Sequence, residues 1–125
     1  MTAPIGAGPG RALIAVYGLF SLAAGARAGV QIASRFGEAP LAYSLSAFAA
    51  LVYLLLTVAL WRGERRLALA ALGIELAGVL VIGTLSLLDA AAFPDETVWS
   101  AYGRGYLFIP LVLPLVGLYW LRRRR

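Results

Sequence analysis

The chain has 125 residues and a formal net charge of +5, and hydrophobic residues make up 62% of it against 14% charged residues. Soluble domains carry roughly 25% charged residues, so a fold in water could not bury this much apolar surface. Cysteine and histidine are both absent, which excludes disulfides, thiolate metal sites, cysteine nucleophiles and any catalytic, metal-binding or haem-binding role for histidine.

Four apolar segments are long enough to cross a membrane, because about 20 predominantly apolar residues span the hydrocarbon core. They cover residues 12–33, 40–61, 67–88 and 102–121. The first two connections are so short that the helices they join must be antiparallel neighbours. We therefore expect an all-α membrane protein, an up-and-down four-helix transmembrane bundle over residues 12–121, between a flexible cytoplasmic tail (1–11) and a basic cytoplasmic tail (122–125).

Arginines gather at one set of segment ends. That set holds Arg11, Arg62, Arg65, Arg66 and Arg122 to Arg125 against the single acid Glu64, whereas the other holds Arg27, Arg35 and Arg104 against Glu38, Asp89, Asp95 and Glu96. Lys and Arg near span ends are retained in the cytoplasm. We expect both termini to be cytoplasmic, in a multi-pass protein of a cell membrane, the inner membrane of a bacterium. Trp61, Tyr119 and Trp120 should then lie at the inner interface and Trp99 at the outer one.

The first segment carries a strip of small residues and, opposite it, a polar stripe. Ser21, Gly25 and Gly29 recur every four residues and form a flat surface for close helix packing. We expect this strip to pack within the chain, and self-association through it is the alternative. Tyr17, Arg27 and Gln31 belong to the polar stripe at helical spacing.

The first segment also has a second interpretation. Arg11, the apolar residues after it and the small residues at 24–26 are typical of a signal peptide with its cleavage site. We favour a membrane span, because Val30 and Ile32 extend the apolar stretch to spanning length. Cleavage would leave three spans and an amino terminus outside the cell.

Polar side chains also follow one face of the second and third segments. Ser46 and Tyr53 share a face of the second segment, and Glu75 shares a face of the third with Ser86 and Asp89. Polar stripes on three helices predict a shared polar interior.

Glu75 is the only acid inside an apolar segment. Its cost of about 3 kcal/mol at a helix centre is offset by the Leu, Ile and Val around it, at about 0.5 kcal/mol each. It can be a neutral acid that donates a hydrogen bond or a carboxylate paired with an arginine. Arg27 lies roughly 10 to 12 Å away along the bundle, which makes a direct pair marginal. We expect Arg27 to reach the outer interface and Glu75 to be protonated, bonded to Tyr53, Ser46 or a backbone carbonyl.

The fourth segment contains Pro110 and Pro114, four residues apart. Each proline removes a backbone donor and frees a carbonyl one turn earlier, which bends a helix. We expect kinks that shape the helix around its neighbours, and ion binding by the freed carbonyls is the alternative. Arg104 lies near the outer end of this segment. We expect it to pair with the acidic loop or to anchor to lipid headgroups, and contact with a substrate anion is the alternative.

No catalytic arrangement of residues is evident, so we expect no enzyme, no cofactor and no metal site. Nucleic-acid binding is not expected either, because the arginine tail is typical of a topology signal. Our first hypothesis is a structural or accessory integral membrane protein that packs against a larger membrane partner or itself. The alternative is a small proton-linked transporter or channel that uses Glu75. Four short spans with a membrane acid resemble the small multidrug resistance transporters, but their acid lies in the first helix.

Two segments, GARAGVQ at 25–31 and TVWSAYGRGYLFIPLVLPLVGLYWLRRR at 97–124, resemble small four-span integral membrane proteins of high-GC actinobacteria. The resemblance covers most of the chain through the layout of the spans, and its residue-level signature is confined to these two segments. It implies the fold and the membrane location, and it implies no activity, cofactor or catalytic residue.

Overall fold

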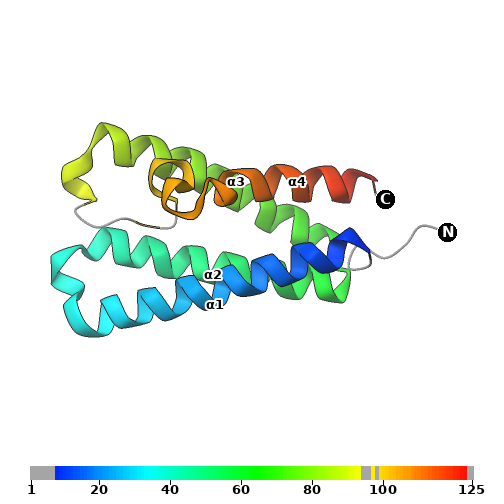
Figure 1. Ribbon diagram of the computed structural model, residues 1–125, viewed down its shortest axis with the longest axis horizontal. Helices are drawn as coiled ribbons and strands as arrows, with labels where there is room; N and C mark the ends of the chain where they lie inside the picture. The colour runs from blue at the N-terminus through cyan, green and yellow to red at the C-terminus, as the bar shows by residue number, and fades with distance from the viewer. Residues whose placement is uncertain (1–7, 94–96, 98, 124–125) are drawn as a thin grey trace.

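The computed structural model describes residues 8–93, 97 and 99–123, and these residues form helices and no strand (Figure 1). The order along the chain is α1 (Pro9–Arg35), the 3₁₀ helix η1 (Phe36–Glu38), α2 (Pro40–Arg62), α3 (Arg65–Leu88), the 3₁₀ helices η2 (Ala90–Ala92) and η3 (Ser100–Tyr106), and α4 (Ile109–Arg123). The prediction of an all-α protein is confirmed for this part of the chain. Residues 1–7 and 124–125 of the two predicted tails, and the acids Asp95 and Glu96, lie outside the described residues.

Three helices, α1 to α3, are long and apolar enough to cross a membrane. A fourth span requires η3 and α4 together, although the two are bent by 98° relative to each other. Helix α1 begins at Pro9, inside the tail predicted over 1–11, because proline is favoured in the first turn of a helix, where its missing N–H has no partner to lose.

A tight turn joins α2 to α3. Gly63 ends α2 with φ of 70°, and its N–H bonds to the carbonyls of Ala59 and Leu60. Glycine adopts this left-handed conformation without the clash that a Cβ would cause. Because α3 begins two residues later, at Arg65, the two helices run antiparallel as neighbours.

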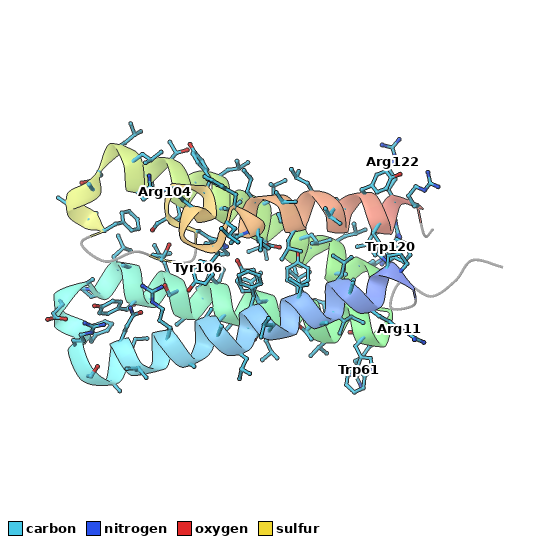
Figure 2. The ribbon with its side chains drawn as sticks, viewed as in Figure 1. Arg11, Trp61, Arg104, Tyr106, Trp120 and Arg122 are labelled. Carbon is cyan, nitrogen blue, oxygen red and sulfur yellow. The ribbon has the colours of Figure 1, made fainter. Side chains whose placement is uncertain are left out.

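The helices form two pairs. Helix α1 packs most extensively against α2, and α4 packs mainly against α3 and η3 (Figure 1). The beginning of α1 and the end of α4 lie at the same end of the molecule (Figure 1), which we call the arginine end because Arg11 and Arg122 lie there (Figure 2). At this end Arg65 Nη1 donates a hydrogen bond to the carbonyl of Leu121, which joins the start of α3 to the last turn of α4.

The fourth predicted segment, 102–121, differs from the expectation of a single kinked helix. Leu107 and Phe108 have φ of 58° and 60° and separate η3 from α4. Within η3, Ala101 and Tyr102 also have positive φ, of 50° and 62°. Non-glycine residues rarely adopt positive φ. The helix is therefore interrupted by the backbone conformation of these residues. We call residues 99–108 the irregular segment.

The two prolines have different positions. Pro110 is the second residue of α4, in the first turn, where a helix accepts proline without losing a hydrogen bond. The expectation that Pro110 kinks the helix is wrong. This proline lies in the first turn of α4, and the bend of 98° lies before it, between η3 and α4. Pro114 lies inside α4, as its spacing predicts.

Candidate functional site

The centre of the molecule contains a buried acid, Glu75 of α3, whose side chain is 0% exposed. Tyr17 of α1 is equally buried and donates its hydroxyl to Glu75 Oε1 at 2.7 Å. The bond joins two helices that are not consecutive in the chain. The second carboxyl oxygen, Oε2, has no hydrogen-bond partner among the described residues.

Packing on α3 explains why Glu75 points inward. Leu72 and Val79, three residues before it and four after it, are both fully buried, so all three lie on the same helix face. Gly117 of α4 allows close approach, since a Cβ there would come within 2.8 Å of Leu72. Burial of these apolar neighbours fixes the rotation of α3 about its axis, and this rotation directs the side chain of Glu75 inward.

A second buried pair lies beside the first. Trp99 Nε1 donates to the hydroxyl of Tyr53 at 2.9 Å, and Trp99 is only 1% exposed. The indole lies against Gly78 of α3, where a Cβ would come within 2.5 Å of the ring. The expectation that Trp99 lies at the outer interface is wrong, because the irregular segment carries this side chain inward, where it contacts Tyr53 of α2 and Gly78 of α3.

Aromatic rings connect the two pairs and extend them along the bundle. The ring centroids of Tyr17 and Tyr53 are 5.9 Å apart, and those of Tyr53 and Trp99 are 6.4 Å apart. Phe20 contacts both Tyr53, at 5.8 Å, and Tyr106, at 5.6 Å. These separations are typical of favourable aromatic contacts. The interior is thus a column of rings with few polar ends, rather than an open polar channel.

The predicted polar cluster is only partly assembled. Tyr53, an expected partner of Glu75, accepts a hydrogen bond from Trp99, and Tyr17 bonds to the acid in its place. Ser46 is buried on α2 and makes no hydrogen bond to Glu75 in the part of the chain that the structure describes. Arg27 is exposed and donates to Tyr106, at 3.2 Å.

Gln31 is the last member of the predicted cluster. It is 3% exposed on α1, but it follows Tyr17 by 14 residues, which corresponds to roughly 21 Å along the helix axis. The structure therefore keeps Gln31 away from the acid.

Hydroxyl groups that the sequence pattern did not predict as a group hold the irregular segment in place. Ser86 Oγ accepts a hydrogen bond from the N–H of Ala101, at 2.8 Å. Thr97 Oγ1 accepts one from the N–H of Trp99, at 3.1 Å, and lies 3.0 Å from Ser100 Oγ. Irregular backbone at membrane depth needs such partners, because lipid supplies none. The position of Ser86 on the polar stripe of the third segment was the available signal.

The strip of small residues lies at the edge of the contact between α1 and α2. Ser21 Oγ donates to the carbonyl of Ala50 at 3.2 Å, and a Cβ on Gly25 would lie 3.8 Å from Ala50 Cβ. At Gly29 a Cβ would meet nothing within 4 Å. The strip therefore begins in a helix contact and ends on the surface, beside a groove of about 560 Å³ between α1 and α2.

These groups can hold a proton and pack helices, and the described residues contain no group of three or more acidic side chains that could hold a metal ion. Comparisons with protein-family models, with curated proteins and with solved structures found no significant match. The described residues form a set of helices compatible with a small multi-pass membrane protein, and they include a buried acid, Glu75, and a groove of small residues.

Proposed function

We propose that this chain is a small integral membrane protein of structural or accessory type that packs against a larger membrane protein. The observation that carries the proposal is the groove between α1 and α2. Its floor is built from small residues, among them Gly25, Ala26 and Gly29 of α1 and Ala47 of α2. Such residues let the backbone of another helix approach closely, and close packing is what drives association inside a bilayer.

The buried acid fits a structural role in this proposal. Glu75 binds Tyr17 and thereby ties α3 to α1. Four surface cavities of about 360 to 610 Å³ are lined by other residues, and Glu75 lines none of them. A polar contact sealed inside the protein stabilises helix packing without offering a path to a substrate.

The proposal includes an up-and-down arrangement in a cell membrane with both termini in the cytoplasm, in a family of small four-span proteins of actinobacteria. The arginine end supports this orientation, because Arg11 and Arg122 lie there together with Trp61 and Trp120 (Figure 2). Cysteine labelling tests it, since the chain has no cysteine of its own. A membrane-impermeant reagent should label Glu38→Cys from outside the cell and Glu64→Cys only after permeabilisation. The reverse pattern would contradict the orientation.

A photo-crosslinking experiment tests the partner. A crosslinking amino acid in place of Gly29 should give one adduct with a larger membrane protein at a defined stoichiometry. The same amino acid in place of Leu19, which is 66% exposed and does not line the groove, should give none. Gly29→Leu should fill the groove and release the partner from the purified complex. An adduct between two copies of this chain would indicate self-association in its place.

The second candidate is a small proton-linked transporter or channel, and one observation favours it. Glu75 Oε2 has no hydrogen-bond partner in the described residues, so this oxygen is available to exchange a proton with water or a ligand if the helices move apart. Protein reconstituted in vesicles should then carry proton flux that Glu75→Gln abolishes and that Glu38→Gln, at an exposed acid, leaves intact. Equal flux in both variants would remove this candidate.

A further inference from the structure

A crevice separates the start of α1 from the end of α4 at the arginine end. Its volume is about 610 Å³, within the range of about 300 to 1,000 Å³ typical of ligand sites. It forms because α4 packs mainly against α3 and leaves α1 largely uncovered there. Figure 2 shows Arg11, Trp120 and Arg122 gathered around this end of the molecule.

The walls of the crevice are apolar. Ala12, Leu13 and Val16 of α1 form one side, and Val116 and Trp120 of α4 form the other. Apolar walls offer few hydrogen-bond partners to water. Within a bilayer, a hydrocarbon chain is the occupant that such walls match.

The mouth of the crevice is cationic. Arg123 lines it, and the guanidinium carbon lies 5.7 Å from the ring centroid of Tyr119, which holds the charge beside the opening. Arg11 and Arg122 add two more cations at the same end (Figure 2). Guanidinium groups bind phosphate oxygens through paired N–H donors, and basic residues at a membrane surface attract anionic lipids.

We propose that this crevice is a binding site for an anionic phospholipid, with one acyl chain between α1 and α4 and the headgroup phosphate at Arg123. Charge complementarity selects this occupant: an apolar crevice with Arg123 at its mouth matches an amphiphile with an anionic head. An apolar helix of a partner protein would fill the crevice but would bring no anion to Arg123. The site is separate from the groove of small residues between α1 and α2, so it does not depend on the proposed partner.

Trp120 makes the site measurable by fluorescence quenching. The chain has three tryptophans; Trp61 is 75% exposed and Trp99 is 1% exposed. A Trp61→Phe variant in detergent retains Trp120 as the reporter and Trp99 as a shielded background. Titration with phosphatidylglycerol brominated on its acyl chains should quench Trp120 to saturation at about one lipid per chain. Brominated phosphatidylcholine, whose choline cation offsets the charge of its phosphate, should need about fivefold more lipid.

Two matched pairs of variants in that background assign the site. Ala12→Phe should fill the crevice and abolish saturable quenching, whereas Ala15→Phe, on an exposed part of the same helix outside the crevice, should leave it unchanged. Arg123→Gln should weaken phosphatidylglycerol binding about fivefold and phosphatidylcholine binding by less. Arg122 does not line the crevice, so Arg122→Gln should have a smaller effect on phosphatidylglycerol binding. Size-exclusion chromatography and circular dichroism check that each variant is folded.

Three results would overturn the proposal. Equal quenching by the two lipids would show that the arginines do not select the headgroup. Quenching that survives Ala12→Phe in a folded protein would place the lipid elsewhere. A change of oligomeric state in Ala12→Phe, with no saturable lipid quenching in the parent, would make the crevice a protein contact. Free inorganic phosphate should not compete with the brominated lipid, because it cannot fill the apolar slot.

Discussion

The two halves of this molecule satisfy their backbone hydrogen bonds in different ways. At the arginine end, α4 completes a set of regular helices, and each helix satisfies its own backbone hydrogen bonds. Toward the other end, η3 and its neighbours take the place of a fourth regular helix. There the hydroxyl of Ser86 on α3 accepts a hydrogen bond from the N–H of Ala101, and the hydroxyl of Thr84 contacts that of Tyr102. If η3 and α4 form one interrupted span, its irregular backbone needs partners from the protein, because unpaired backbone donors and acceptors are costly in lipid.

The largest effect is expected at the contact between Trp99 and Gly78, which anchors the irregular segment against α3. Gly78→Leu should expel the indole, remove its bond to Tyr53 and destabilise the protein by roughly 3 to 5 kcal/mol, the range for losing a large buried aromatic side chain. Gly73→Leu is the matched control on α3, because a Cβ there meets nothing within 4 Å. Equilibrium unfolding by sodium dodecyl sulfate in mixed micelles, followed by circular dichroism, measures both. Equal stability of the two variants would show that Trp99 does not anchor the irregular segment.

Ser86 tests whether hydroxyls support the irregular backbone. Ser86→Ala should leave the N–H of Ala101 without its acceptor, at a cost of about 1 to 3 kcal/mol for an unsatisfied buried donor. In the same unfolding assay, Ser34→Ala should change stability by less than about 0.5 kcal/mol, because its hydroxyl only bonds within α1 and is exposed. A loss at Ser34 as large as the loss at Ser86 would contradict this role.

The hydrogen bond between Tyr17 and Glu75 joins α1 to α3 at the centre of the molecule, and its contribution to stability can be measured. Tyr17→Phe removes the donor to Glu75 Oε1 and should cost about 1 to 3 kcal/mol, since a buried polar group loses its partner. Glu75→Gln keeps an acceptor for Tyr17 and should cost less than about 1 kcal/mol. Unfolding of the two single variants and the double variant gives the coupling between them. A larger loss in Glu75→Gln than in Tyr17→Phe would mean that the acid does more than accept this bond.

The smallest effect is expected at Arg27. Its bond to Tyr106 is exposed, so Arg27→Gln should change stability by about 0.5 kcal/mol or less. Tyr106→Phe should match it, and the double variant should be no worse than either single one. A loss above about 2 kcal/mol would show that Arg27 has a buried role.

Much of the fold can be predicted from apolar length and helical spacing. The first three segments, predicted at 12–33, 40–61 and 67–88, lie close to the observed Pro9–Arg35, Pro40–Arg62 and Arg65–Leu88. The fourth could not be predicted in the same way. Its break depends on positive φ at residues that are not glycine, such as Leu107 and Phe108, and hydrophobicity does not encode backbone handedness.

The site shows the same limit. Helical spacing placed Tyr17, Tyr53 and Glu75 on inward faces, and all three are buried. Which tyrosine reaches the acid depends on how far each helix is shifted and rotated, which spacing does not give. The partner of Tyr53 is Trp99, and Trp99 could not be placed without knowing that the irregular segment turns back into the bundle.

The short α4 gives the molecule unequal sides. With 15 residues it spans about 22 Å at 1.5 Å per residue, against roughly 30 Å of hydrocarbon in a typical bilayer. Leu107 and Phe108, 83% and 44% exposed, separate α4 from the 3₁₀ helix η3. In a membrane, we expect the lipid next to α4 to thin or the whole molecule to tilt toward that side. Such a shape favours thinner or curved regions of a bilayer.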